Sequence, residues 1–337
     1  MSAPVLFTTN YPMAEARRLW RAGEYPGYHL FGTAQLEARG WRVEDLPEFK
    51  VAGGRVGGAL SARFGSREAQ AAIVKRRREE HVAYAADPVS YAGLAILRSL
   101  GLWKRPVVAV VHPYVARDRV SLRALRGYDA VVALSKRIRD ELVNDVGRDP
   151  KRTLWAPAGP DVTFPLYEPL GAEYVVSSGK TYRDEATLLA ALDGIDVPAH
   201  VHTLSHDGDV ERGAVTVVGK APYTRVLDDL RRATAVAIPL SNPTGTYGIT
   251  ELNDALGLAK PIVQTRNPYL DVDLEAVGCG WFVDQGDVEG WRRVLREVAA
   301  DPAATAERGR AGRAFAEREW NWDHFADAVR EAIEMVS

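Results

Sequence analysis

Cysteine is almost absent from this sequence of 337 residues, which has Cys279 as its single thiol. One cysteine cannot form a disulfide within the chain, and thiolate metal sites need several, so both kinds of site are excluded. A lone cysteine in an apolar run such as residues 278–283 is more often a buried small residue than a nucleophile. We therefore expect Cys279 to be buried, and we expect a reducing, cytoplasmic compartment.

An excess of charge of either sign is also absent, because 43 Lys and Arg residues stand against 45 Asp and Glu residues, a formal net charge of -2. No overall basic field exists to hold nucleic acid or an anionic membrane. No run approaches the roughly 18 apolar residues of a membrane-spanning helix. Residues 1–12 lack the basic and apolar regions of a signal peptide. We expect no nucleic-acid partner and at most peripheral membrane contact.

One stretch departs locally from this balance of charge. Residues 75–80 read KRRREE and lie in a segment, residues 66–85, that we predict to be helical. The run is typical of a solvated helix face. It is also compatible with a basic patch that contacts anionic lipid or a phosphorylated acceptor. Composition leaves both interpretations open.

Short apolar runs alternate with helical patterns from end to end, with 46% hydrophobic and 26% charged residues overall. The length fits two domains of moderate size. The predicted strands are residues 5–9, 41–43, 106–111, 129–134, 173–177, 199–204, 214–218, 235–239 and 261–265, and residues 153–161 are a predicted strand with the loop that follows it. This alternation is typical of parallel α/β architecture. The Pro- and Gly-rich residues 157–169 are the predicted linker.

A basic loop follows the first predicted strand of the second half. It contains Gly179, Lys180 and Arg183. Ligands bind at the carboxyl ends of parallel strands, where loops and helix N-termini converge. Glycine lets the backbone approach a phosphate closely, and two cations three residues apart suit a diphosphate. A basic loop at a strand end is equally often ordinary surface.

A second candidate loop, residues 241–250, follows the predicted strand 235–239 and opens a helix that carries Asp254. Backbone N–H groups and the positive dipole end at such a helix start suit anions. Asp254 lies one turn further along, where a carboxylate can accept hydrogen bonds from ribose hydroxyls. It can instead simply complement the helix dipole, as acidic residues in a first turn commonly do.

The order and spacing of these features resemble the family 4 glycosyltransferases of the GT-B fold. The resemblance covers nearly the whole chain, including a last N-domain strand at residues 130–135 and a Pro-x-Gly-x-Asp segment within residues 155–161. It also includes a loop beside the nucleobase at residues 218–222 and a C-terminal tail from residues 320–323 that crosses back to the first domain. No single motif carries the resemblance; their sequential agreement does.

The resemblance implies a donor site in the second half of the chain. It assigns Lys180 and Arg183, next to Gly179, to the donor diphosphate as catalytic cations. It assigns the helix start and residues 246–247, which lead into it, to phosphate and sugar oxygens. It assigns Lys220 and Ala221 to the nucleobase and Asp254 to the ribose. These donor-binding positions are, in chain order, Lys220, Ala221, Thr246, Tyr247, Gly248, Ile249, Thr250 and Asp254.

Two positions depart from the family pattern. Thr246 stands where many members have a glutamate that contacts the sugar hydroxyls, and this leaves sugar recognition open. The segment Gly248-Ile249-Thr250 resembles the Gly-x-Thr opening of some branches of the family, so activity is not excluded. Ala259 replaces the usual glycine before Lys-Pro, a change that we interpret as structural.

The first half of the chain supplies the expected acceptor side. His112, after the apolar strand 106–111, matches an N-domain histidine that faces the sugar, and the resemblance implies a catalytic role for it, although it can also cap the strand end. Gly27 and His29 lie in a loop rich in tyrosine. Because aromatic rings stack on sugar faces, this loop suits an acceptor; plain packing accounts for it equally well.

The resemblance predicts an α/β protein with two Rossmann-like, doubly wound domains facing across a cleft. Residues 1–165 are the predicted acceptor domain, residues 166–318 the donor domain, and residues 319–337 a helix returning to the first domain. The implied activity is retaining, metal-independent transfer of a sugar from a nucleotide diphosphate-sugar to an acceptor hydroxyl, without a cofactor. The sequence has no cluster of Asp, Glu or His at the spacing of metal ligands, which agrees with transfer without a metal.

Three alternatives stay open at this stage. A nucleotide-sugar epimerase shares the fold and needs acid and base groups around the sugar. A hydrolase or phosphorylase would consume the donor without an alcohol acceptor. Thr246 in place of the glutamate is also compatible with a non-catalytic, donor-binding partner of another transferase.

Overall fold

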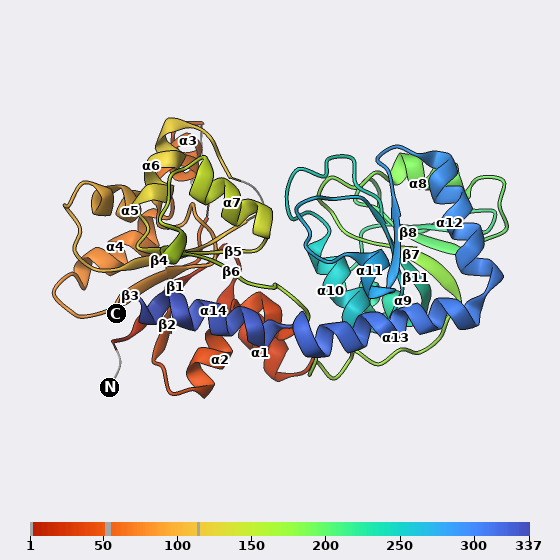
Figure 1. Ribbon diagram of the computed structural model, residues 1–337, viewed down its shortest axis with the longest axis horizontal. Coiled ribbons are helices and arrows are strands. Elements are labelled where there is room, and N and C mark those ends of the chain that lie inside the picture. The colour runs from red at the N-terminus through yellow and green to blue at the C-terminus, as the bar shows by residue number, and fades with distance from the viewer. Residues whose placement is uncertain (1–2, 51–54, 113–114) are drawn as a thin grey trace. The chain divides into compact units, whose positions relative to one another are not determined.

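The computed structural model describes residues 3–50, 55–112 and 115–337. Within it the chain forms two compact units (Figure 1). Unit 1 contains residues 1–158 and 322–337, and unit 2 contains residues 159–321. The sequence predicted a first boundary at 165/166, seven residues after the observed 158/159. It predicted a second boundary at 318/319, three residues before the observed 321/322. Pro113, directly after His112, lies outside the described residues.

Unit 1 is built on a six-stranded parallel sheet of order β2-β1-β3-β4-β5-β6. The strands are β1 Val5–Thr8, β2 Val43–Asp45, β3 Val82–Ala85, β4 Val107–Val111, β5 Ala130–Ala133 and β6 Thr153–Trp155. Its helices are α1 Met13–Arg21, η1 Gly27–Leu30, α2 Thr33–Ala38, α3 Arg55–Phe64, α4 Arg67–Lys75, α5 Ala92–Ser99, α6 Arg119–Gly127, α7 Lys136–Asn144, η2 Pro150–Arg152 and α14 Trp322–Glu334.

Unit 2 is built on a seven-stranded sheet of order β13-β12-β11-β7-β8-β10-β9, in which β9 is antiparallel to its neighbour. The strands are β7 Tyr174–Ser177, β8 Ala199–His202, β9 Val210–Arg212, β10 Val215–Val218, β11 Ala233–Ile238, β12 Ile262–Thr265 and β13 Gly280–Val283. Its helices are α8 Glu185–Leu192, α9 Tyr223–Arg232, α10 Ile249–Gly257, α11 Leu274–Val277, α12 Val288–Ala300 and α13 Pro302–Glu319.

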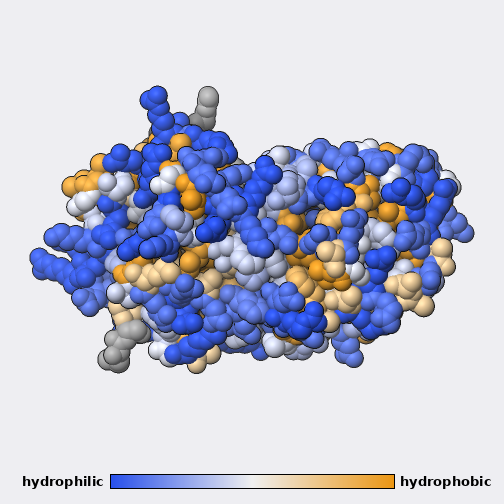
Figure 2. All heavy atoms as spheres, viewed as in Figure 1, coloured by the Kyte–Doolittle hydropathy of each residue, from blue (hydrophilic) through white to orange (hydrophobic). Residues whose placement is uncertain are grey.

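The strands are central because they are apolar on both faces. All five residues of β4, VVAVV, are buried, which is the pattern of a parallel strand covered by helices on both sides. The helices are amphipathic instead and turn one apolar side to the sheet. The face of the molecule shown in Figure 2 is accordingly mostly hydrophilic. Cys279 is buried as expected, and burial raises the pKa of its thiol to about 12.

The predicted helix over residues 66–85 is wrong in its second half. Helix α4 ends at Lys75, turns follow, and residues 82–85 form β3, a buried central strand of the unit 1 sheet. The strand reads VAYA, and two alanines hide its β character because alanine favours helices. In the charged run, Arg76 forms ion pairs with Glu44 and Glu79.

The last helix, α14, belongs to unit 1 although α13 belongs to unit 2. Its buried side includes Phe325, Val329 and Ile333. It contacts β5, β6 and α2 (Figure 1). Arg39 beside α2 forms an ion pair of 2.9 Å with Asp327. The tail predicted from residues 320–323 therefore completes the first sheet unit with a helix from the far end of the chain.

Candidate functional site

Each sheet reverses its strand order at one point, and ligands of such folds bind outside the carboxyl ends of the strands there. In unit 2 the reversal lies between β7 and β11, the first strand and its neighbour. The loops that leave these two strands are residues 178–184, which contain the predicted basic loop, and residues 239–248, which overlap the predicted loop 241–250. They run side by side, because Ser241 N donates to Tyr182 O at 2.9 Å and Asp184 N donates to Pro239 O at 3.1 Å.

The loop after β7 is shaped by Gly179 and Arg183. Gly179 has φ of 101°, and a Cβ there would lie 1.6 Å from Glu251 Oε1, so only glycine fits. The Arg183 guanidinium donates to Ser178 O at 3.0 Å and to Thr181 O at 2.8 Å. Its third nitrogen lies 2.6 Å from Glu251 Oε1 in an ion pair whose side chains are 5% and 6% exposed.

Lys180 lies on the surface of the same loop. Within the part of the chain that the structure describes, Lys180 forms no ion pair, whereas the charge of Arg183 is matched by Glu251. The two cations that the sequence treats as equivalent are thus in different environments. The Lys180 ammonium is available to an added anion, and the guanidinium of Arg183 holds the loop against α10.

The loop after β11 delivers the N-terminus of α10 to the same place. Gly248, the N-cap, has φ of 91° and no side chain with which to cap the helix. The first N–H groups of a helix lack intrahelical acceptors, so they can bind an anion. Asn267, a buried residue after β12, donates to Gly245 O at 2.9 Å and to Tyr247 O at 3.2 Å and so fixes the loop. No motif in the sequence marks Asn267 as a site residue.

Thr246 and Asp254 are both buried, with 4% and 3% of their surface exposed. The Asp254 carboxylate accepts hydrogen bonds from two tyrosines at one oxygen, Oδ1. Tyr167 donates at 2.6 Å and Tyr223 donates at 3.2 Å. Sequence analysis did not select either tyrosine. The three come from α10, the start of α9 and the segment before β7, so only the folded chain brings them together.

The predicted nucleobase loop, residues 218–222, runs from the end of β10 to the start of α9 and packs on residues 206–209. Lys220 N donates to His206 O at 3.1 Å, and Lys220 Nζ lies 3.3 Å from Asp207. A Cβ on Gly219 would lie 2.3 Å from Gly208 O, so the two glycines allow the close approach. Gly219 N also donates to Asp209 at 3.3 Å.

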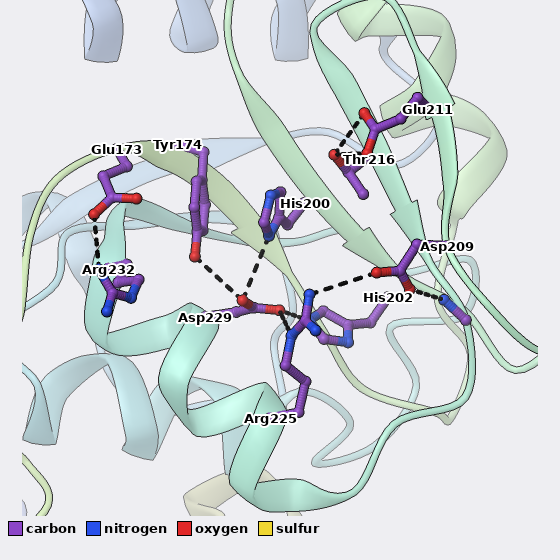
Figure 3. A network of polar contacts seen from close by, with 11 residues as sticks. Glu173, Tyr174, His200, His202, Asp209, Glu211, Thr216, Arg225, Asp229 and Arg232 are labelled. Atoms are coloured by element: carbon purple, nitrogen blue, oxygen red, sulfur yellow. Dashed lines mark hydrogen bonds and ion pairs between the residues drawn. The ribbon is translucent and has the colours of Figure 1, made fainter.

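Asp209 connects this loop to a buried polar network around Asp229 (Figure 3). Arg225 lies 3.5 Å from Asp209 and 3.3 Å from Asp229. Asp229 also accepts from Tyr174 at 3.2 Å and lies 3.0 Å from His202. Burial alone would raise the pKa of Asp229, but its contacts with His202, Arg225 and His200 outweigh this and lower the pKa to about 2. The network anchors α9, which begins directly after the loop.

In unit 1 the strand order reverses between β1 and β3, and His112 follows the next strand, β4. The His112 ring is half-buried, with Nε2 3.0 Å from Ala86 O. It lies parallel to the Phe31 ring, with centroids 6.2 Å apart. Burial lowers the pKa of His112, which makes the neutral imidazole the form present at neutral pH. Phe31 has φ of 50°, an uncommon conformation for a non-glycine residue.

Gly27 and His29 both lie in η1, and both are buried. The His29 ring is enclosed by three tyrosine rings, whose centroids lie 4.2 Å (Tyr28), 4.4 Å (Tyr25) and 5.7 Å (Tyr11) from it. Burial lowers the pKa of His29 to about 3. Tyr11 is 41% exposed and forms the open side of this aromatic cluster, whereas His29 itself belongs to its interior.

Other features of the chain bear on ligands and membranes. A surface cavity of about 660 Å³ in unit 2 is lined by residues at the end of α8 and by the turn before β10, and contains none of the predicted site residues. Among the described residues, no cluster of three or more His, Cys, Asp or Glu side chains is placed to hold a metal ion. In the same residues, no helix is long and apolar enough to cross a bilayer.

The architecture is that of the GT-B glycosyltransferases, as the sequence predicted. HepE from Anabaena, in a structure with UDP-glucose, matches with a TM-score of 0.66 and 15% identity over 99% of this chain and 100% of that chain. Sucrose-phosphate synthase from Thermosynechococcus elongatus matches with a TM-score of 0.69 and 14% identity over 99% of both chains.

A third similar structure is trehalose 6-phosphate synthase from Burkholderia multivorans, with a TM-score of 0.67 and 10% identity over 100% of this chain and 97% of that chain. No model of a known protein family matches the sequence, and no curated protein matches it. The likeness that these structures show is therefore one of fold.

Proposed function

We propose that this protein is a glycosyltransferase that uses a nucleotide diphosphate-sugar as donor. One observation carries the proposal: at the strand-order reversal of unit 2, the glycine-basic loop of Gly179 and Lys180 lies against the open N-terminus of α10. A diphosphate is the ligand that suits a close backbone approach, a cation and helix amides together. The UDP-glucose in the HepE structure is consistent with such a donor.

In this proposal the chain stabilises the departing diphosphate by fixed positive potential. Negative charge grows on the diphosphate as the sugar leaves, and donors already in place for that charge lower the barrier. Lys180 and the amides of residues 248–250 supply the potential. Arg183 contributes by holding the loop rigid through Glu251, and adds its own charge only to the extent that Glu251 leaves it uncompensated.

The acceptor side is assigned to unit 1. We assign His112 to the transferred sugar and the cluster around Tyr11 and His29 to the acceptor. The neutral His112 imidazole can donate and accept hydrogen bonds with sugar hydroxyls without adding a charge. An exposed tyrosine ring such as Tyr11 offers a flat apolar face to a sugar ring. The acceptor is a hydroxyl group of a glycan, glycolipid or small molecule.

We further propose transfer with retention of anomeric configuration and without a metal or cofactor. The acceptor hydroxyl attacks from the side on which the diphosphate departs, and a diphosphate oxygen takes its proton. No carboxylate nucleophile is needed in this scheme, because the acceptor hydroxyl attacks the sugar directly. The carboxylates of Asp254 and Glu251 are bonded to tyrosines and to Arg183. The charge that a divalent ion often supplies comes instead from Lys180 and the helix.

A thermal-shift panel of UDP-, GDP- and dTDP-sugars tests the donor site, because a ligand that binds the folded state raises Tm. We expect one nucleotide to give a clear shift and Lys180→Ala to abolish or greatly reduce it. Since Lys180 is exposed, the variant should keep the Tm of the unliganded protein. Lys151→Ala, an exposed lysine of unit 1, is the control and should keep the shift.

A panel without any shift would contradict the proposed donor, and an unchanged shift in Lys180→Ala would remove Lys180 from the site. Product analysis of the bound donor then separates the activities. Transfer to an added acceptor supports a glycosyltransferase, and isomerised donor supports an epimerase. Binding without turnover supports a non-catalytic partner, the alternative that is based on Thr246 in place of the glutamate.

A further inference from the structure

The carboxylate of Asp254 is held by two phenol groups. Tyr167 Oη lies 2.6 Å and Tyr223 Oη lies 3.2 Å from the same oxygen, Oδ1. Hydrogen bonds to an ionised acceptor are stronger than neutral ones, and two of them at one oxygen fix the rotation of the carboxyl group. The direction in which the other oxygen, Oδ2, points is therefore set by the two tyrosines.

Tyr167 is built to act only as a donor to this carboxylate. It is 8% exposed, and burial together with the nearby Asp254 raises the pKa of its phenol well above the ordinary value, so the phenol keeps its proton. Its ring packs directly on α10, since a Cβ on Gly257 would lie 2.3 Å from Tyr167 Cε2. Tyr167 thus connects the segment before β7 to the C-terminal half of α10.

Tyr223 connects the same carboxylate to the loop assigned to the nucleobase. It is the first residue of α9, two residues after Ala221, and its ring is half-buried. Aspartate is one methylene shorter than glutamate, so its reach depends more on how the backbone and neighbours aim it. A hydroxyl that reaches from the base loop to Asp254 supplies that aim.

We propose that Tyr167 and Tyr223 are positioning residues that direct the Asp254 carboxylate toward the ribose hydroxyls of the bound nucleotide. The proposal rests on the proposed function, because it takes the ligand to be a nucleoside diphosphate. The tyrosines should affect affinity only for ligands that carry the ribose diol. A purely structural role would lower the affinity whether or not the ligand has these hydroxyls.

The test is a double-mutant cycle between protein and ligand. Calorimetric titration with UDP and with 2′,3′-dideoxyuridine diphosphate compares ligands that differ only in the two ribose hydroxyls. We expect Tyr167→Phe and Tyr223→Phe each to weaken UDP binding by about five- to tenfold, within the range of one ordinary hydrogen bond, because the tyrosines act on the ribose only through Asp254. Binding of the dideoxy ligand should change less than about twofold, because that ligand makes no contact with Asp254.

Tyr91→Phe is the control. Its phenol is also buried and donates a hydrogen bond, but to Leu6 O in unit 1, away from the loops assigned to the nucleotide. This variant should bind both ligands as the wild type does. A Tm measured without ligand for each variant shows whether the fold is retained.

Equal losses for UDP and the dideoxy ligand in Tyr167→Phe and Tyr223→Phe would overturn the positioning role while leaving the proposed function intact. Unchanged binding of UDP in both variants would do the same. If the wild type binds GDP and not UDP, the same cycle is carried out with GDP and its dideoxy form. Failure to bind UDP, GDP and dTDP alike overturns the proposed function and this inference with it.

Discussion

Lys180 and Arg183 lie three residues apart in one loop, and the sequence alone makes them an equivalent pair. Burial separates their roles. The Arg183 guanidinium is bonded at all three nitrogens, and its partner Glu251 is as buried as Arg183 itself. Breaking one member of such a buried pair leaves an uncompensated charge, which costs about 3–5 kcal/mol. Arg183 is therefore tied to folding, while Lys180 can serve binding alone.

A second residue-scale distinction concerns His29, for which burial decides the charge. The folded state holds the pKa of His29 at about 3, against 6.5 for an unperturbed histidine. Between these values the unfolded chain binds a proton that the folded chain does not, so stability falls as pH falls from about 6.5 toward 3. The loss is about 1.4 kcal/mol per pH unit for one proton.

We predict that His29→Phe removes this dependence. Urea unfolding at pH 7.5, 5.5 and 4.5 should show the wild type losing stability relative to the variant at each step below pH 6.5. His112, whose pKa is also lowered by burial, is present in both proteins and cancels in the difference. Parallel losses in the two proteins over this range would show that His29 is not the group that titrates.

At the scale of elements, the two loops at the strand-order reversal depend on glycine. Gly179 and Gly248 both have positive φ, and added Cβ atoms would meet Glu251 and Ile238. Ala259, where the family usually has glycine, has φ of 53° at the end of α10. A left-handed alanine costs about 1–2 kcal/mol. The turn after α10 thus explains why glycine is usual here, in agreement with the structural interpretation of Ala259.

We predict that Gly179→Ala disrupts the loop after β7 and removes nucleotide binding. The added Cβ displaces Glu251 from Arg183, because it would lie 1.6 Å from the carboxylate oxygen. Gly194→Ala is the control, since Gly194 also has positive φ, 74°, but meets no atom within 4 Å. Both variants place an alanine at positive φ, but only the first meets a clash. Thermal shifts with UDP should therefore be lost in the first variant only; retention in both would show that the loop tolerates the clash.

Element prediction from sequence succeeded where composition was decisive. The apolar runs that became β4, β5 and β12 differ from prediction by no more than one residue at either end. It failed for β3, whose two alanines favour helix, and it did not identify the short β9 or β13. These strands form because neighbouring strands offer hydrogen bonds, a contribution that local propensity does not contain.

At the scale of the whole molecule, the chain leaves unit 1 at Ala158 and returns to it at Trp322. Unit 1 is therefore incomplete until the last residues are made. Helix α14 contributes Phe325, Val329 and Ile333 to its core, all fully buried. Each such side chain stabilises the folded state by about 1.5–3 kcal/mol.

We predict that a chain ending at Asn321 has a destabilised unit 1 and an intact unit 2. Hydrogen exchange followed by mass spectrometry should show faster exchange in β4, β5 and β6, with unit 2 strands unchanged. UDP binding, which we assign to unit 2, should persist. A chain ending at Met335 keeps α14 and is the control. Equal loss of protection in both units would show that they fold as one cooperative body.

The sequence by itself determined the α/β class, the strands of the two sheets that are apolar on both faces, and the two glycine loops, because these depend on local chemistry and spacing. The tertiary structure decided which charged and polar groups are available. It placed Glu251 on Arg183 and two tyrosines on Asp254, pairs separated by up to 87 residues along the chain. Burial and partners acquired across such distances set the state of an ionisable group, and no local pattern encodes them.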